Sequence, residues 1–185
     1  MKIVKAEKEF IFDKNPSAPS CHASTVLPLD GGKTVLSAWF AGAKEGEDDV
    51  GIWLSKRTDG KWSAPVLLTK EKDVPHWNPV LFKREDSSII LYYKFGKHIP
   101  YWQTRYIISK DNGETWSQPY DIVKDDTTGG RGPVKNKCIR ISNGDVLAPA
   151  STEQKGRWRC FIDISHDDGL TFEKQKYIVR PRTAK

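Results

Sequence analysis

The sequence Ser-Lys-Asp-Asn-Gly-Glu-Thr-Trp at residues 109–116 returns as Ser-His-Asp-Asp-Gly-Leu-Thr-Phe at residues 165–172. A weaker relative, Ser-Lys-Arg-Thr-Asp-Gly-Lys-Trp, occupies residues 55–62. Successive copies begin 54 and 56 residues apart. Repetition at this spacing indicates a fold that is built from similar units placed side by side.

Both complete copies follow an apolar run and combine an aspartate, a glycine and a final aromatic residue. The glycine permits a turn with positive φ, and the aspartate can accept hydrogen bonds from the backbone of its own turn. The aromatic residue then returns to the core. We therefore assign Asp111, Gly113, Asp167 and Gly169 to structure and not to chemistry.

Four short β runs align in each unit, which describes the four-stranded antiparallel blade of a β-propeller. We expect an all-β fold with no substantial helix, and blade repeats at about residues 20–70, 75–125 and 132–180. The expected runs are 24–27, 34–40, 50–54 and 66–68; 80–81, 89–94, 105–108 and 120–123; 138–139, 146–148, 160–164 and 176–179.

Three blades do not close a ring, because propellers typically have about four to eight. The whole chain, residues 1–185, is thus expected to be one partial propeller, about half of a ring. It is either truncated or completed by another copy. Open edges of this kind predict self-association.

The composition is that of a globular domain, with 37% hydrophobic residues and a net charge of +6. No basic run with interleaved aromatics points to nucleic acid, and no apolar run could span a membrane. Residues 1–12 lack a signal-peptide core, so we expect a cytoplasmic protein, or a periplasmic or secreted one if a signal was removed. Three cysteines form no disulfide framework or metal-binding spacing, and we expect no metal and no cofactor.

The order of strands in a blade places two sets of loops at opposite ends. The aspartate-containing turns fall at one end, and the loops between second and third strands, with the links between blades, fall at the other. The unusual residues belong to this second end. They are His22, Glu45, Asp48, His76, Asn78, Lys94, Arg131, Lys135, Asn136 and Glu153.

Alternation along a strand sharpens this prediction, because residues i and i+2 share a side. The alignment matches His22 with His76, and Ser24 with Asn78 and Asn136. These positions begin the first strands, which line the central channel of a propeller. We therefore expect two imidazoles and two amides to converge at one mouth.

The chain resembles bacterial proteins of the sialidase-like, BNR or Asp-box repeat β-propeller family. The resemblance covers nearly the whole chain and rests on the repeats and on residues 21–25, 38–46, 75–82 and 129–137. It implies a six-bladed propeller, of which this chain is the N-terminal half, and glycosidase-type activity. Residues 18–22 read Ala-Pro-Ser-Cys-His where sialidases carry an Arg-Ile-Pro motif, and the tyrosine nucleophile of sialidases would lie in the other half.

The resulting hypothesis is a glycoside hydrolase that acts on a terminal, acidic sugar of a glycan. His22, Glu45 and Asp48 are the candidate catalytic residues, and His22 and Glu45 could donate a proton to the leaving oxygen. Arg131 stands between glycines that leave its guanidinium free to hold a carboxylate. The candidate substrate-binding residues are His76, Asn78, Lys94, Arg131, Lys135, Asn136 and Glu153.

Two other functions remain open. A uronate lyase would use a histidine of this end to abstract a proton beside a neutralised carboxylate. A non-catalytic propeller would bind a glycan or a protein. Whatever the function, His22 and His76 could instead be structural, and the acidic run at residues 45–49 could be a solvated loop. We expect this chain alone to be inactive, because half a mouth cannot enclose a substrate.

Overall fold

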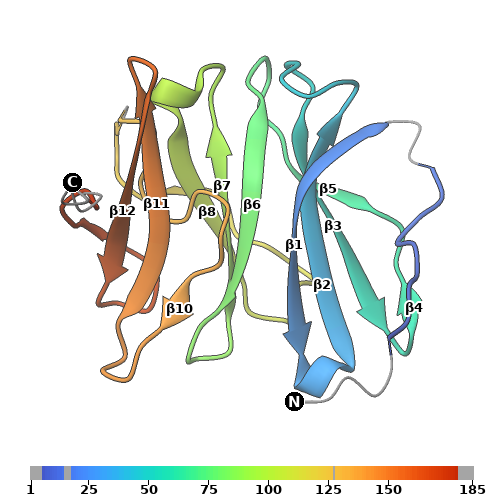
Figure 1. Ribbon diagram of the computed structural model, residues 1–185. Coiled ribbons are helices and arrows are strands. Elements are labelled where there is room, and N and C mark those ends of the chain that lie inside the picture. Colours follow the sequence, from blue (N-terminus) through green and yellow to red (C-terminus); the bar gives the residue numbers. More distant parts are fainter. Residues whose placement is uncertain (1–5, 15–17, 127, 179–185) are drawn as a thin grey trace, which may run out of the picture.

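The computed structural model describes residues 6–14, 18–126 and 128–178 and contains three antiparallel sheets that stand side by side (Figure 1). We call them blades 1, 2 and 3 in chain order. Within the described residues the helical segments are two short 3₁₀ turns, η1 (Asp30–Gly32) and η2 (Ile99–Tyr101). Neither turn approaches the length that a helix needs to cross a membrane.

Each blade is formed by consecutive strands. Blade 1 holds β1 (Ser20–Leu29), β2 (Thr34–Gly42), β3 (Gly51–Thr58), β4 (Lys61–Trp62) and β5 (Val66–Thr69), and both β4 and β5 pair with β3. Blade 2 holds β6 (His76–Lys83), β7 (Ile89–Phe95), β8 (Gln103–Ser109) and β9 (Tyr120–Asp121). Blade 3 holds β10 (Ile139–Arg140), β11 (Val146–Gln154), β12 (Arg157–Ser165) and β13 (Glu173–Lys174).

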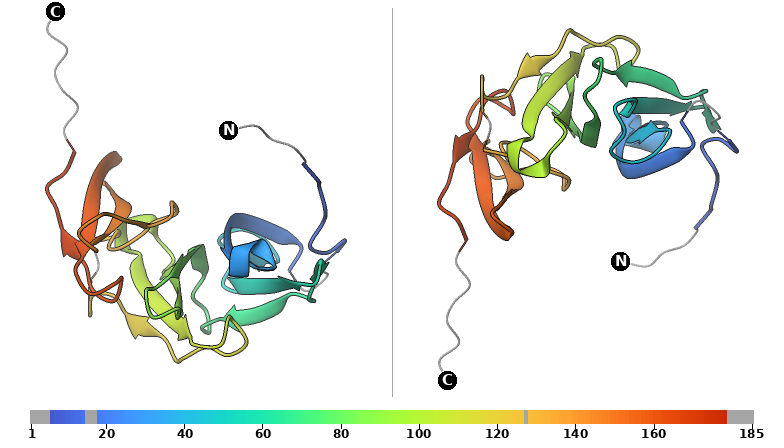
Figure 2. Two further views of the ribbon diagram at one scale, coloured as in Figure 1. Left: turned by 90° about the horizontal axis from the view of Figure 1, so that it is seen from below. Right: turned by 90° about the horizontal axis from the view of Figure 1, so that it is seen from above.

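The blades form an open arc with their first strands on the concave side, as Figure 2 shows end-on. The all-β fold and the partial propeller are thus confirmed. The last strand was placed too late in the sequence, since β13 ends at Lys174 and residues 176–178 form no strand. Residue 179 of that expected run lies outside the described residues.

The middle blade is covered on both faces. Leu91 and Tyr93 of β7 join a core cluster with Phe40 of blade 1, whereas Tyr92 joins a second cluster with Val146 of blade 3. Six consecutive residues of β7, from 89 to 94, are buried for this reason. Alternating side chains that pack in opposite directions hold successive blades together.

The two Asp-box turns, residues 109–116 and 165–172, adopt the same closed geometry. In the first, Asp111 Oδ1 accepts bonds from Ser109 Oγ at 2.8 Å and from the Thr115 amide at 2.9 Å. Asp167 accepts the equivalent bonds at 2.7 and 2.9 Å. The hydrogen bonds to its own turn hold the pKa of the Asp111 carboxyl down at about 2.

Each Asp-box glycine also allows its turn to pack closely against the preceding blade. Gly113 has a φ of 86°, and a Cβ there would lie 2.9 Å from Leu36 of blade 1. Gly169 has a φ of 93°, and its carbonyl accepts a bond of 2.7 Å from the Tyr92 hydroxyl of blade 2. Only glycine fits the backbone conformation and the close approach together.

Candidate functional site

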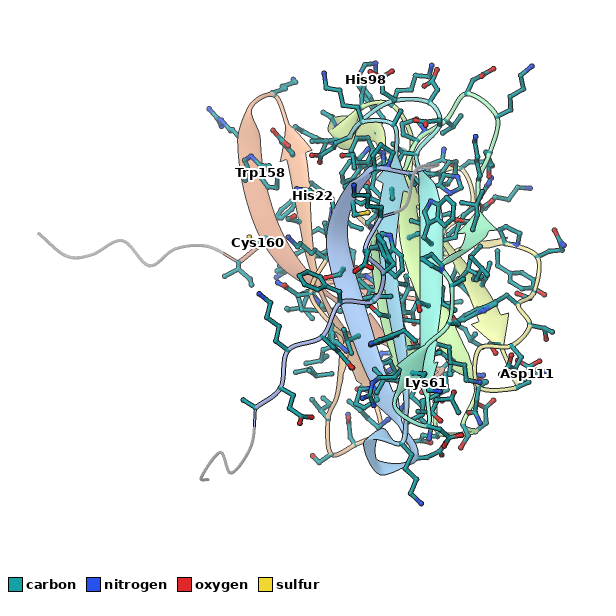
Figure 3. The ribbon with its side chains drawn as sticks, turned by 90° about the vertical axis from the view of Figure 1, so that its right-hand side faces the viewer. His22, Lys61, His98, Asp111, Trp158 and Cys160 are labelled. Carbon is teal, nitrogen blue, oxygen red and sulfur yellow. The ribbon has the colours of Figure 1, made fainter. Side chains whose placement is uncertain are left out.

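The two sets of loops lie at opposite ends of the arc. His98, in the loop between β7 and β8, stands at one end, whereas Asp111 and Lys61 stand at the other (Figure 3). The repeat phase predicted this separation. We call the end that carries His98 the mouth end.

A pocket of about 390 Å³ opens at the mouth end and is lined by residues of blades 2 and 3, and we call it the mouth pocket. Its walls include the apolar side chains of Ile99, Trp102 and Trp158. Four polar residues that the sequence singled out also line it, namely Asn78, Lys135, Asn136 and Glu153. Apolar walls with a few polar groups are typical of sites for small organic ligands.

Glu153 is the most distinctive group of the mouth pocket. It lies near the end of β11, opposite Trp158 of β12 in the strand register. Its Oε2 atom is buried and forms no hydrogen bond within the described part of the chain. A buried carboxylate oxygen without a partner is costly, so this atom is placed to receive a donor from a ligand or water.

A second hollow, of about 610 Å³, adjoins the mouth pocket, since Lys135 lines both. His22 and Ser24 of β1 line this second hollow. His22 Nε2 lies 4.0 Å from Glu45 Oε2, and both side chains are about half exposed, at 60% and 50%. The imidazole is therefore beside a carboxylate and open to solvent.

The carboxylates of the acidic loop before β3 have different roles. Asp49 Oδ2 accepts the Ala43 amide at 2.8 Å and so closes the loop. Asp48 forms an exposed ion pair of 2.9 Å with Lys97. This pairing disfavours Asp48 as a catalytic group, and Glu45 is the carboxylate that faces His22.

His76 does not reach the mouth, which corrects its expected role. Its side chain is 1% exposed, bonds Thr69 Oγ1 through Nδ1 at 2.9 Å and packs on the Tyr93 ring at 5.0 Å. Burial lowers the pKa of His76 to about 4. The imidazole is a neutral part of the contact between blades 1 and 2.

The cause is a one-residue slip in the sequence alignment. Both first strands carry a bulge, with a positive φ at Ala23 (51°) and at Asn78 (44°). These bulges match Ala23 with Asn78, so His22 corresponds to Trp77 and not to His76. A shift of one residue turns a strand side chain to the opposite face.

Lys94 is also structural, contrary to its expected contact with substrate. It is fully buried, and its Nζ donates to Thr104 Oγ1 at 2.5 Å and to the Arg131 carbonyl at 2.6 Å. Burial lowers the pKa of Lys94 to about 7. Through its bond to the Arg131 carbonyl, the Lys94 side chain stabilises the link between blades 2 and 3.

Arg131 is committed to the same link and does not present a free guanidinium. Its Nε donates to Asp163 Oδ2 at 3.1 Å, and a terminal nitrogen donates to the Phe172 carbonyl at 2.6 Å. The Asp163 side chain is completely buried, and this carboxylate also accepts the Gly132 amide at 2.5 Å. Lys135 is therefore the cation of this link that remains at the pocket.

Trp158 is a pocket residue that the sequence analysis missed. It is 65% exposed, yet it lies opposite Glu153 across the β11–β12 hairpin. The tight turn at Lys155-Gly156, where both residues have positive φ, could have revealed this register. In the described part of the chain, His, Cys, Asp and Glu side chains do not gather in any group of three that could hold a metal ion.

The comparisons with known proteins agree with the fold. The model of the BNR repeat-like domain matches residues 33–183. No curated protein matches the sequence significantly.

Several solved structures share the architecture. The Hadza microbial sialidase Hz136 is 16% identical, with 87% of this chain and 38% of that chain covered and a TM-score of 0.72. A NanB sialidase variant from Streptococcus pneumoniae is 11% identical, with coverages of 93% and 46% and a TM-score of 0.72. Zg3597, a family 117 glycoside hydrolase of the marine bacterium Zobellia galactanivorans, is 14% identical, with coverages of 89% and 58% and a TM-score of 0.65.

These identities support likeness of fold and nothing finer. The chain spans between 38% and 58% of the length of these three structures.

Proposed function

Because the chain belongs to the BNR repeat-like domain family, we propose that it forms part of the sugar-binding mouth of a glycoside hydrolase. Sialidases and a family 117 glycoside hydrolase are among the structures that share its fold. The proposed substrate is a glycan that presents a terminal acidic sugar. The activity is assigned to the whole protein and not to this chain alone.

The unpartnered Glu153 carboxylate is the observation that supports this proposal most directly. The mouth pocket, at about 390 Å³, has room for one sugar ring, and Trp102 and Trp158 are among its lining residues. The Lys135 ammonium would attract the sugar carboxylate, and the amides of Asn78 and Asn136 would bind hydroxyl groups.

Hydrolysis of a glycosidic bond commonly uses two carboxyl groups on either side of the bond. Glu153 lines the mouth pocket, and Glu45 lies 4.0 Å from His22, which lines the adjoining hollow. In the proposed reaction one of these groups protonates the leaving oxygen, and the other assists the attack on the sugar.

A uronate lyase is the second candidate, and the exposed His22–Glu45 pair is the observation that favours it. A neutral His22 imidazole would remove the proton beside the sugar carboxylate, while Lys135 would stabilise the resulting negative charge. Elimination leaves an unsaturated ring that absorbs ultraviolet light. Hydrolysis leaves none.

The test uses the whole natural protein and a panel of aryl glycosides and uronate-containing oligosaccharides. Turnover of an acidic glycoside that falls by about 10²–10⁴-fold in Glu153→Gln supports the hydrolase. Glu173→Gln is the matched control, because Glu173 is exposed on β13. Absorbance of an unsaturated product, lost in His22→Ala, would replace the hydrolase by the lyase. Sugar binding without any turnover would replace both by a binding module.

We also propose that the outer face of blade 3 pairs with a second copy of the chain. The corresponding face of blade 1 is covered by the N-terminal segment, where Phe12 packs on Trp39 at 5.5 Å. Blade 3 instead leaves Ile139 56% exposed and Ile141 38% exposed. Sedimentation should show association that weakens in Ile139→Lys. A monomer at every concentration would contradict this proposal.

A further inference from the structure

A basic cluster at the tip of blade 3 stands apart from the other charges. The structure describes seven arginines, and five of them lie in ion pairs with carboxylates. These five are Arg57, Arg84, Arg105, Arg131 and Arg140. Within the described residues no ion pair joins Arg157 or Arg159 to an acidic side chain, although every other described arginine has such a partner.

The two arginines lie on a β-hairpin with a tight turn and a defined register. β11 and β12 are joined by a tight turn in which Lys155 (φ 51°) and Gly156 (φ 68°) both have positive φ. Such two-residue turns match the twist of the strands and fix the hairpin register. Arg157 therefore pairs with Gln154, and Arg159 with Thr152.

These residues surround a pocket of about 490 Å³, which we call the basic pocket. It is lined by Thr152, Gln154, Lys155, Arg157, Arg159 and Tyr177. Three cations thus meet hydroxyl and amide groups around one hollow. A fourth cation, Lys174, donates to the Tyr177 hydroxyl at 3.0 Å, and Thr152 bonds the same hydroxyl at 3.2 Å.

The basic pocket and the mouth pocket lie on opposite faces of one hairpin. Glu153 and Trp158 line the mouth pocket, whereas their strand neighbours Thr152 and Arg157 line the basic pocket. Thr152 shares its face with Ala148, which packs toward blade 2. The basic pocket therefore lies on the side of the hairpin that faces blade 2, away from the outer face that we propose to pair with a second copy.

We propose that the basic pocket binds a sulfate or carboxylate group of an acidic polysaccharide, as a second site beyond the mouth. Guanidinium groups without carboxylate partners are suited to bidentate bonds with such anions. The choice of a glycan rests on the proposed function. The anion pocket itself follows from the unpaired arginines.

Nucleic acid fits the pocket less well. Binding of single strands depends on aromatic faces on which bases stack. The aromatic ring of the pocket is Tyr177, and cations already cover it, with Arg159 at 5.4 Å and Lys174 at 4.6 Å from its centroid. A compact anionic group can still reach the guanidinium edges.

The experiment measures binding to the chain by calorimetry at low and at physiological salt. The probes are a chondroitin sulfate hexasaccharide, a hyaluronan hexasaccharide, uncharged maltohexaose and a single-stranded oligonucleotide. The first two separate sulfate from carboxylate recognition. Replacement of both arginines (Arg157→Gln with Arg159→Gln) is compared with Lys33→Gln with Lys61→Gln, which removes the same charge from exposed residues at the Asp-box end.

We expect an acidic hexasaccharide to bind and the arginine variant to lose about tenfold or more in affinity, because two charge-assisted hydrogen bonds disappear. The lysine variant should stay within about twofold, since distant charges are screened by salt. Replacement of both arginines by lysine should give an intermediate loss.

No binding of either acidic probe would overturn the proposal, as would equal losses in the two charge-matched variants. An oligonucleotide that binds as tightly as the hexasaccharides would overturn the assignment to a glycan. Acidic probes that bind a protein without glycosidase turnover would support the basic pocket while the proposed function fails.

Discussion

The Asp-box end and the mouth end of the arc differ in how completely their polar groups are satisfied. Asp111 and Asp167 accept bonds from their own turns, and the two copies repeat each other within about 0.1 Å in the bonds compared above. At the mouth end Glu153 keeps an unpartnered buried oxygen, and His22 stands half exposed beside Glu45. The mouth residues also differ from blade to blade.

This contrast separates the groups that hold the blades from those that are available to a ligand. A repeated, closed turn contributes the same stability in each blade and leaves nothing for a partner to bind. A buried carboxylate oxygen without a donor lowers the stability of the unliganded protein, because no hydrogen bond offsets the cost of its burial. We infer that the mouth end is the functional end, and the predictions below test that division.

The largest expected effect concerns His76, which the sequence placed at the mouth but which is buried between blades 1 and 2. Its pKa is lowered to about 4, so the unfolded chain takes up a proton first as the pH falls below its ordinary value of 6.5. Stability present above about pH 6.5 should therefore be lost toward pH 4, by up to about 3 kcal/mol.

Denaturant unfolding at a series of pH values measures this loss. His76→Gln should flatten the profile in that window and leave sugar binding unchanged. His98→Gln, at an exposed loop residue, is the control and should keep the wild-type profile. If His76→Gln kept the wild-type dependence of stability on pH, the assignment of His76 to the contact between blades 1 and 2 would be wrong.

Lys135 provides the next test, because it is the cation shared by the two mouth hollows. Lys135→Met should weaken binding of an acidic sugar by about 10–100-fold, the loss expected for one charge-assisted hydrogen bond. Lys110→Met removes an exposed cation within an Asp-box turn and should change affinity little. Equal losses of affinity in the two variants would contradict the assignment of sugar binding to the mouth end.

A smaller effect is expected at the Asp-boxes. Asp167→Ala removes an acceptor for four donors of its turn, namely the Ser165 hydroxyl, the Leu170 amide, and the amide and hydroxyl of Thr171. By analogy with helix caps, the free energy of unfolding should fall by about 0.5–2 kcal/mol. Asp111→Ala should act in the same direction. Unchanged melting temperatures, or a loss of sugar affinity without a loss of stability, would contradict the structural assignment.

The sequence predicted the blades and the two ends because both depend on repeat spacing and strand order. It failed where a side chain's direction depends on one residue of register, as at the bulge that turns His76 away from the mouth. It also failed for Arg131, whose partner Asp163 lies 32 residues later and is buried by folding. Lys94 was misjudged because a lysine in a run of apolar residues becomes buried only when blades cover both faces of its strand.

Trp158 illustrates a different gap. Its role depends on pairing with Glu153, and neither residue belongs to the repeated pattern. Turn chemistry at Lys155-Gly156 fixes that pairing, so hairpin register is the signal that could find such residues in related sequences.

An NMR titration of the isotopically labelled chain with glucuronic acid or N-acetylneuraminic acid tests the central claim most directly, since it detects millimolar binding and locates it. The division of the ends predicts amide shifts that gather at Asn78, Lys135, Asn136 and Glu153, with Gly113 and Gly169 unmoved. Shifts that gather at the Asp-box turns, or no shift with either sugar, would contradict it.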